Sequence, residues 1–390
     1  MRATLFAATA ALALAACNGA GEAVESNSSA VSQAGGTGTG SHEIDIQPVA
    51  SFSQPWAMAF LPDGSALVTQ KSGELIWVPS LGAGSVAKTP VAGVPQADVG
   101  GQGGLGDVAV HPDFARNRLV YLSWVEAGDG DTRGAVVGRA RLVAEGGAPR
   151  LERMQVIWRQ QPKVDGRGHF GHRLAFAPDG KLFISNGDRQ KFDPAQDMGQ
   201  AVGKIVRLND DGSVPDDNPF AGQGGVAAQV WTLGHRNPLG LAFASDGRLW
   251  SHEMGPKNGD EFNLIERGDN YGYPIVSNGE HYDGKPIPDH STRPEFNAPE
   301  ITWNGLSPAG LMIYSGSLFP NWRGDAFLGG LSGQALVRVE MDGNNAREAQ
   351  RWDMNARIRE VEQGPDGAIW VLEDERGGSG GRLLRLTPKG

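Results

Sequence analysis

The pattern that decides the fold is clearest at Leu174-Ala175-Phe176-Ala177-Pro178-Asp179-Gly180, which is followed by Leu182-Phe183-Ile184. Apolar side chains alternate through both runs, as in a β-strand whose successive side chains point to opposite faces. The Asp-Gly pair between the runs permits the positive φ that a tight turn requires. The stretch therefore predicts a β-hairpin.

Further copies of this hairpin pattern recur about every 50 to 70 residues, which leaves room for a four-stranded sheet per copy. They occupy residues 56–69, 105–122, 239–250, 311–314 and 361–372, and the copy at 311–314 is degenerate. Four-stranded antiparallel sheets repeated around an axis give a β-propeller. We predict an all-β fold, a six-bladed β-propeller; a large β-sandwich is the alternative, but it predicts shorter and more even strand spacing. With 57 glycines and 24 prolines, and no sustained helical period, few helices are expected.

Residues 1–16 have the features of a lipoprotein signal peptide. Arg2 supplies a positive charge, and the apolar run from Leu5 to Leu14 is too short to span a bilayer. Small residues precede Cys17, which predicts lipidation of this cysteine; an ordinary signal peptide with a chance cysteine is the alternative. Cys17 is the only cysteine, so no intrachain disulfide can form. Asn18 is not the aspartate associated with inner-membrane retention, so we expect a periplasmic protein anchored by lipid in the outer rather than the inner membrane.

Residues 17–41 are rich in glycine, serine and threonine and contain no aromatic residue, so we expect a flexible tether. Residues 42–390 are then one propeller domain, because no second stretch of low complexity divides them. The net charge is −10 and the basic residues form no block, which argues against nucleic acid as a partner. A small metabolite remains as the expected class of ligand.

Long polar insertions between the hairpins carry the candidate site residues, because the loops of a propeller gather around its channel. They span residues 98–106, 163–173, 188–203, 231–238 and 254–283. His169, which follows Gly168, is a candidate general base, because the pKa of histidine lies near neutrality. A loop histidine bonded to a backbone carbonyl is the alternative, and it is the interpretation we prefer for His172.

Two stretches offer arginines. Gly234-His235-Arg236-Asn237-Pro238 sets a guanidinium beside an amide, which suits a carboxylate ligand; a structural arginine that closes the loop is the alternative. Arg357 and Arg359 precede the last hairpin and would project from a strand on the same side. They can hold an anion or pair with Glu360 or Glu362, although those carboxylates point to the other face.

Carboxylates, amides and backbone carbonyls gather at residues 253–263 and again at 269–271. This cluster lacks the Cys and His spacing of a zinc site, and its hard oxygen groups suit Ca²⁺. An acidic solvated turn is the alternative. Together, one histidine, three arginines and a Ca²⁺ site before successive blades favour a channel built for a small polyanion.

From about Pro55 to Leu386 the chain carries a series of motifs in a fixed order. They are Gly101-Gln102-Gly103-Gly104-Leu105, His111-Pro112-Asp113-Phe114, His169-Phe170-Gly171, Gly203-Lys204-Ile205-Val206-Arg207-Leu208, Gly234-His235-Arg236-Asn237-Pro238, Asp260-Glu261-Phe262-Asn263-Leu264 and Asn270-Tyr271-Gly272-Tyr273-Pro274. In this order they resemble the soluble quinoprotein glucose dehydrogenase and aldose sugar dehydrogenase family. The resemblance implies a six-bladed propeller that holds pyrroloquinoline quinone (PQQ), a tricarboxylate, with Ca²⁺ in its mouth.

The resemblance also implies roles for individual residues. His169 matches the family's general base, which takes the proton of the anomeric hydroxyl while hydride passes to the quinone. The positions that match cofactor contacts are Gln102, Arg236, Asn237, Tyr282, Arg357 and Arg359. The carbonyls of Gly255 and Pro256 match the ligands of the cofactor's Ca²⁺, and Glu261 and Tyr271 match a second, structural Ca²⁺ site.

Two positions depart from the family pattern. Ser332 stands where many members place a lysine against the cofactor, so one cofactor cation is missing. The alternatives are weaker PQQ binding, or replacement of that cation by Lys204 or Lys257 from a neighbouring loop. Gly168 stands where the glucose-specific branch carries an acid, which favours the broader aldose branch.

The resulting functional prediction is PQQ-dependent oxidation of aldose sugars to aldonolactones, with electrons passed to an acceptor of unspecified chemistry. The alternatives are a Ca²⁺-dependent sugar lactonase, which needs carboxylates around a central metal, and a non-catalytic propeller that binds glycans or a partner. Contact with a membrane is expected only through the N-terminal lipid, and both a monomer and a homodimer are compatible with this prediction.

Overall fold

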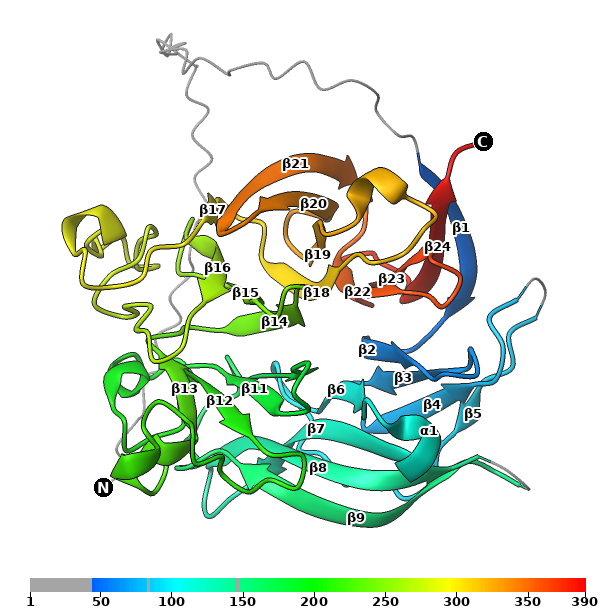
Figure 1. The fold of residues 1–390 in the computed structure, drawn as a ribbon, viewed down its shortest axis with the longest axis horizontal. Helices are drawn as coiled ribbons and strands as arrows, with labels where there is room; N and C mark the ends of the chain where they lie inside the picture. Colours follow the sequence, from blue (N-terminus) through cyan, green and yellow to red (C-terminus); the bar gives the residue numbers. More distant parts are fainter. Residues whose placement is uncertain (1–43, 83–84, 145–146) are drawn as a thin grey trace, which may run out of the picture. The chain divides into compact units, whose positions relative to one another are not determined.

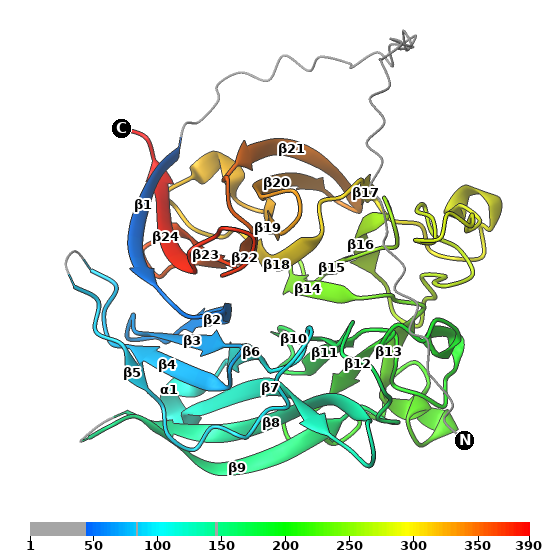
Figure 2. The same cartoon turned by 180° about the vertical axis from the view of Figure 1, so that it is seen from behind.

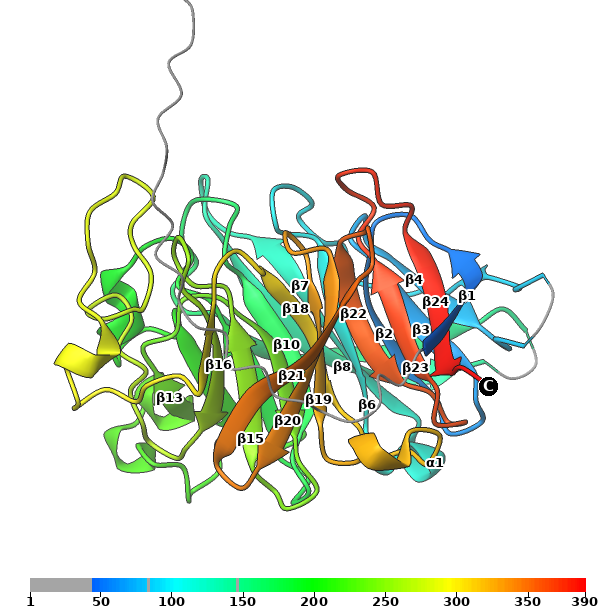
Figure 3. The same cartoon turned by 90° about the horizontal axis from the view of Figure 1, so that it is seen from above.

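Six four-stranded antiparallel sheets make up the protein in a computed structural model that describes residues 44–82, 85–144 and 147–390. The sheets stand like blades around a central axis (Figures 1 and 2), and from the side their strands run through the thickness of a disc (Figure 3). The predicted all-β, six-bladed propeller is confirmed. The predicted signal peptide and tether, residues 1–41, lie outside the described residues.

Each blade has its innermost strand first and its outermost strand last. The first three blades are β2 (Pro55–Phe60), β3 (Ala66–Gln70), β4 (Glu74–Val78) and β5 (Thr89–Pro90); β6 (Leu105–Val110), β7 (Leu119–Ala127), β8 (Arg133–Val143) and β9 (Arg150–Arg159); and β10 (Gly171–Phe176), β11 (Leu182–Asn186), β12 (Lys204–Leu208) and β13 (Val230–Leu233). The next two are β14 (Pro238–Phe243), β15 (Leu249–Glu253), β16 (Asp260–Ile265) and β17 (Ile301–Trp303); and β18 (Pro308–Ile313), β19 (Ala326–Gly330), β20 (Ala335–Asp342) and β21 (Asn345–Asp353). The sixth is β22 (Ile358–Gln363), β23 (Ile369–Glu373), β24 (Arg382–Pro388) and β1 (Ile44–Ser51).

Helices are scarce among the described residues, as expected from the glycine and proline content. The α-helix α1 (Phe114–Asn117) has four residues, and none of the described helices is long and apolar enough to cross a membrane. The remaining helical segments are short 3₁₀ turns: η1 (Asp193–Gln196), η2 (Ala221–Gln223), η3 (Ala227–Gln229), η4 (His290–Thr292) and η5 (Pro320–Trp322).

The repeated sequence pattern corresponds to the hairpin formed by the two innermost strands of each blade. Phe176 pairs with Leu182 across the Asp-Gly turn of the third blade. The degenerate copy is also a hairpin, because β18 pairs with β19. Its connection contains η5 in place of an Asp-Gly turn, which explains why the pattern is incomplete there.

The hydrophobic core is divided among the interfaces between neighbouring blades. One cluster joins Trp56 and Leu67 of the first blade to Leu105 and Leu122 of the second, and five further clusters are distributed around the ring. A single sheet cannot cover its own apolar faces, so each blade is stable only between two others. The ring closes because β1 pairs with β24 and completes the last blade.

Every innermost strand departs from regular pairing near its first residue. The register shifts fall at Pro55/Ala57, Leu105/Val108, Gly171/Leu174, Pro238/Gly240, Ala309/Leu311 and Ile358/Glu360. A β-bulge turns side chains out of the regular alternation. The bulges lie at the end of the propeller opposite the Asp-Gly turns, and we call this end the mouth.

Candidate active site

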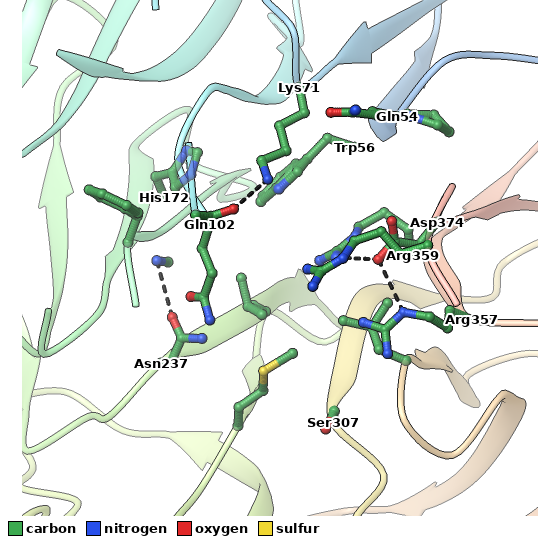
Figure 4. Close-up of a pocket in the computed structure, with 18 of the residues that line it drawn as sticks. Gln54, Trp56, Lys71, Gln102, His172, Asn237, Ser307, Arg357, Arg359 and Asp374 are labelled. Carbon is green, nitrogen blue, oxygen red and sulfur yellow. Dashed lines mark hydrogen bonds and ion pairs between the residues drawn. The ribbon is translucent and has the colours of Figure 1, made fainter. Parts of the chain in front are cut away.

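A cavity of about 370 Å³ opens at the mouth and is lined by residues at the mouth ends of five blades and by Gly101 and Gln102 of the loop that precedes the second blade. We call it the cation-lined cavity, because Lys71, Arg357, Arg359 and Arg376 line it together with a single carboxylate, Asp374. Figure 4 shows Arg357 and Arg359 converging on Asp374, with Lys71 and Gln102 across the cavity. Such an excess of positive charge suits a ligand with several carboxylates.

The two arginines of the last blade lie as the sequence predicts, on one side and together. Arg357 Nε lies 3.3 Å and Arg359 Nη2 2.9 Å from Asp374 Oδ2. Burial lowers the pKa of Arg359. Glu360 points elsewhere, into a buried ion pair with Arg173. The arginines are thus not neutralised by the glutamates beside them in sequence.

The prediction that Lys204 or Lys257 replaces the lysine that is absent at Ser332 is wrong. Lys204 is buried, and its Nζ donates to the carbonyls of Pro194, Ala195 and Val202. Lys257 does not line the cation-lined cavity. Lys71, directly after β3, lines it together with Ser332.

Lys71 lies close enough to other cations of the cavity for their charges to affect its pKa. Its Nζ donates to the Gly101 carbonyl, and its pKa is lowered by burial and by Arg376 and Arg359. A bound anion would offset this repulsion.

His169 forms a pair with Asp188 beside the cation-lined cavity. His169 Nδ1 lies 2.6 Å from Asp188 Oδ1, so the carboxylate fixes a proton on Nδ1 and leaves the lone pair on Nε2. Burial lowers the pKa of His169, while the hydrogen bond to Asp188 opposes this shift. Gln102 Oε1 accepts the His169 backbone N–H at 2.7 Å. Gly187 permits the approach of the two loops, because a Cβ there would lie 2.3 Å from the His169 carbonyl oxygen.

His172 has a structural role, as the sequence favours, but it lies on β10 rather than in a loop and its partner is a serine hydroxyl rather than a backbone carbonyl. It is buried, its Nδ1 lies 2.8 Å from Ser123 Oγ, and its ring stacks on Trp56. Burial lowers its pKa to about 3, so it stays neutral.

Arg236 and Asn237 are held by a buried carboxylate. Glu253 accepts the backbone N–H groups of both residues, and its other oxygen lies 2.9 Å from His235 Nδ1. Asn237 Oδ1 accepts from Gly171 N, while Asn237 Nδ2 is buried without a partner among the described residues. A buried unpaired donor at the wall of a cavity is a suitable contact for a ligand oxygen.

A second cavity, of about 620 Å³, adjoins the first. His169 and Arg236 line the second cavity, and the residues that follow them, Phe170 and Asn237, line the first. We call it the aromatic cavity. It contains His169, Asp188, Phe192, Arg236, Tyr273 and Tyr282. Tyr282 is 77% exposed, and the Arg236 guanidinium lies 5.8 Å from its ring centre.

The carbonyls of Gly255 and Pro256 lie close to these groups. Arg236 donates to the Gly255 carbonyl, and Gly259 N donates to the Pro256 carbonyl at 3.1 Å. Each carbonyl oxygen has a second lone pair. The two oxygens are therefore chemically suited to a hard cation such as Ca²⁺.

The second predicted Ca²⁺ position contains an unfavourable arrangement of charge. Glu253 and Glu261 are direct cross-strand partners on β15 and β16, and both are buried. Burial and then Glu253 raise the pKa of Glu261 well above its usual value. Asn263 Oδ1 is buried with no partner in the described part of the chain. A bound cation would relieve both features.

Tyr271 lies next to this acidic pair. Its ring stacks on His235 at 4.7 Å between centres, and its carbonyl oxygen lies 3.1 Å from His290 Nε2. The predicted residues Glu261 and Tyr271 are thus connected through Glu253 and His235. Among the described residues, no group of three or more His, Cys, Asp or Glu side chains forms a metal site.

Lys71, Asp188, Glu253, Asp374 and Arg376 are functional candidates that the sequence analysis did not assign. Each of them lies within three residues of the end of a second strand, which is β3, β11, β15 or β23. These strand ends reach the mouth in every blade. The sequence signal that could have identified these residues is a polar residue at the end of the second apolar run of a hairpin pattern.

Comparisons with known proteins identify the family of the chain. A model of the glucose/sorbosone dehydrogenase family matches residues 52–385. The aldose sugar dehydrogenase of Escherichia coli is 40% identical over 346 residues, which cover 86% of this chain and 90% of that protein. A crystal structure of the apo form of the E. coli enzyme has a TM-score of 0.82 at 36% identity, covering 89% of this chain and 100% of that one.

A further relative carries the cofactor. The PQQ-bound aldose sugar dehydrogenase of Streptomyces coelicolor has a TM-score of 0.73 at 28% identity, covering 89% of this chain and 98% of that one. The family match covers all six blades and both cavities. The chain therefore belongs to the glucose/sorbosone dehydrogenase family of soluble quinoprotein sugar dehydrogenases.

Proposed function

We propose that this protein oxidises aldose sugars at the anomeric carbon to aldonolactones and that it depends on PQQ and Ca²⁺. The observation that carries the proposal is the position of the His169–Asp188 pair beside a cavity with four cations and one carboxylate. The first feature supplies a base, and the second binds a polyanion. The name of the S. coelicolor relative supports PQQ as that polyanion.

The residues present fit this cofactor. Lys71, Arg357, Arg359 and Arg376 would hold its carboxylates, and the unpaired Asn237 Nδ2 would donate to one of its oxygens. The carbonyls of Gly255 and Pro256 would hold Ca²⁺. When bound, the quinone accepts a hydride, and Ca²⁺ polarises its carbonyl as a Lewis acid.

The protein's own groups carry out the proton transfer. His169 Nε2 takes the proton of the anomeric hydroxyl, and the C–H bond of the same carbon breaks with loss of hydride, so that the hydroxyl becomes the lactone carbonyl. Asp188 keeps the imidazole in the required tautomer and stabilises the imidazolium. Gln102 holds the backbone of His169 in place.

The alternatives fit less well. A Ca²⁺-dependent lactonase needs converging carboxylate ligands, whereas the described part of the mouth presents mostly cations. A purely binding propeller gives the buried His169–Asp188 pair no role.

As part of the same proposal, residues 1–17 place the enzyme in the periplasm on a lipid anchor, where it passes electrons to a separate acceptor.

The test is reconstitution of the protein with PQQ and Ca²⁺, followed by dye reduction with glucose and other aldoses and identification of the product. We expect dye reduction that requires PQQ and gives the lactone, and a loss of turnover of at least about 10²-fold in His169→Gln with cofactor binding retained. Asp216→Asn, at an exposed carboxylate that lines neither cavity, is the control. No dye reduction with any aldose would overturn the proposal.

A further inference from the structure

Arg189 lies in the interior of the protein, directly after Asp188 of the proposed catalytic pair. It is 0% exposed. Within the part of the chain that the structure describes, its guanidinium makes no ion pair, and its hydrogen bonds go to backbone carbonyls. Burial of a charge is costly unless the surroundings supply hydrogen bonds, so a guanidinium in this place needs an explanation.

The Arg189 guanidinium binds the loop that carries His169. Its Nε donates to the Gly168 carbonyl at 2.8 Å, and its Nη2 donates to the Gly166 carbonyl at 2.5 Å. Its Nη1 donates at 2.8 Å to the carbonyl of Arg133, the first residue of β8. The guanidinium therefore connects the loop before β10 to the neighbouring blade.

Arg189 also contacts the chain on the other side of His169. Its guanidinium lies 3.8 Å from the centre of the Phe170 ring, which is buried. The backbone N–H of Arg189 donates to the His169 carbonyl at 3.3 Å. Side chain and backbone of Arg189 thus hold the peptide group before His169 and the peptide group after it.

The backbone of His169 needs this support, because its φ is +48°. Positive φ is unfavourable for a side chain of this size and persists only where the surroundings enforce it, often at functional sites. Gln102 accepts the N–H of His169, and Arg189 binds the carbonyls of Gly168 and His169. Arg189 therefore supplies two of these three constraints on the direction of the imidazole.

The charge of Arg189 also acts on His169. Burial lowers the pKa of Arg189 to about 10, so the guanidinium is still a cation at neutral pH. Burial is the main cause that lowers the pKa of His169; among the charged groups, Asp188 opposes this shift, while Arg236 and Arg189 add to it. Removal of the Arg189 charge should therefore raise the pKa of the imidazole.

We propose that Arg189 is a positioning residue for the reaction, which orients His169 against Asp188 by holding the peptide groups on both sides of the base. The inference rests on the proposed function and adds a residue to it. Arg189 lines neither the cation-lined cavity nor the aromatic cavity, so it acts only through His169 and its loop. Its charge has a second effect, because a nearby cation opposes protonation of the imidazole before the sugar binds.

Two variants separate the hydrogen bonds of Arg189 from its charge. Arg189→Gln removes the charge, whereas Arg189→Lys keeps it but lacks the planar guanidinium that reaches three carbonyls. In PQQ- and Ca²⁺-loaded protein, both should lower kcat for glucose about tenfold, with the KM within about threefold of wild type. Only Arg189→Gln should move the acid limb of the pH profile of kcat/KM to higher pH, by about half a pH unit.

A second readout does not depend on turnover. The His169 imidazole can be titrated by ¹⁵N NMR in protein without PQQ, with its signals assigned by their loss in His169→Gln. Its pKa should rise in Arg189→Gln and stay at the wild-type value in Arg189→Lys. Arg207→Gln is the matched control, because Arg207 is also a buried arginine, it donates to Asp217 and Asn218, and it lines neither cavity. This control should lower the melting temperature and leave kcat and the His169 pKa unchanged.

Wild-type kcat in either Arg189 variant, or an unchanged His169 pKa in Arg189→Gln, would overturn the inference. A lower melting temperature without a change in the His169 titration would leave Arg189 a purely structural role. If Arg189→Gln does not fold, Arg189→Lys decides, since its kcat must fall while its acid limb stays at the wild-type pH. Failure of the proposed function is distinguishable, because wild-type protein would then oxidise no sugar, whereas the titration of His169 would still test Arg189.

Discussion

A histidine acts as a base only when its proton is fixed on one nitrogen and its lone pair is free on the other. In this protein Asp188 performs that task for His169. The sequence predicted His169 from its glycine-flanked loop and from the family motif, but not Asp188. The pairing of β10 with β11 brings the two residues together, because Gly171 lies opposite Asn186. The sequence pattern predicts the hairpin but not the distance between these two side chains.

The pH dependence of the reaction tests this pair. Because burial lowers the pKa of His169, the neutral base persists to lower pH, and kcat/KM for glucose should hold its plateau to below about pH 6.5. Asp188→Asn removes the group that raises this pKa, so the acid limb should move to still lower pH while the plateau falls roughly 10- to 100-fold. Asp216→Asn, at an exposed carboxylate that lines neither cavity, should leave the profile unchanged. An acid limb above pH 6.5 in the wild type would contradict this account.

Lys71 gives a second residue-scale prediction, because it offers a cation across the cavity from Arg357 and Arg359. Lys71→Met should weaken PQQ binding about tenfold, as expected for loss of one charge-assisted contact. The measurement is a PQQ titration followed by tryptophan fluorescence, which does not require turnover. Ser332→Lys in the Lys71→Met background should restore binding in part. Lys88→Met, an exposed lysine that lines neither cavity, is the control, and unchanged affinity in Lys71→Met would refute the role.

At the scale of elements, the sequence predicts the regular pairing of the inner strands but not the β-bulges within them. Period-2 alternation and Asp-Gly turns identify the hairpins, because regular pairing has a sequence signature. The bulges at the start of each innermost strand have no such signature. One of them places Trp56 in the wall of the cation-lined cavity beside Pro55, which a regular alternation does not predict for consecutive residues.

The pairing of β15 with β16 makes a prediction about Ca²⁺. Glu253 and Glu261 face each other across these strands, and like charges in that position are destabilising unless a cation lies between them. With chelator, Glu261→Gln should melt at or above the wild-type temperature; with Ca²⁺ it should melt several degrees below, because only the wild type gains from the ion. Glu280→Gln, an exposed carboxylate on the following insertion, should respond to Ca²⁺ as the wild type does. An undiminished Ca²⁺ response in Glu261→Gln would exclude this carboxylate as a ligand.

For the whole molecule, stability and function depend on a closed ring. Each apolar cluster needs two neighbouring blades, and the cation-lined cavity is lined from five blades and from the loop that precedes the second blade. The sequence predicted six blades by counting repeats, but it did not predict that the N-terminal strand completes the last one. That strand carries no copy of the hairpin pattern.

Truncation tests the closure. Protein that starts at residue 44 should have the same melting temperature as the 390-residue protein, since all strands are kept. Protein that starts at residue 52 loses β1, exposes the edge of β24 and should melt about 10 °C lower or aggregate. Equal melting temperatures for the two truncations would show that β1 is dispensable.

The central claim is that a sugar at His169 reduces a quinone held by the cations of the mouth. The most direct test is to mix PQQ- and Ca²⁺-loaded protein with glucose, without oxygen or any other acceptor, and to follow the absorption spectrum of the bound cofactor. The account predicts full conversion to the reduced spectrum in the wild type and a rate at least about 10²-fold lower in His169→Gln. A wild-type spectrum that no aldose changes, or conversion at the wild-type rate in His169→Gln, would contradict it.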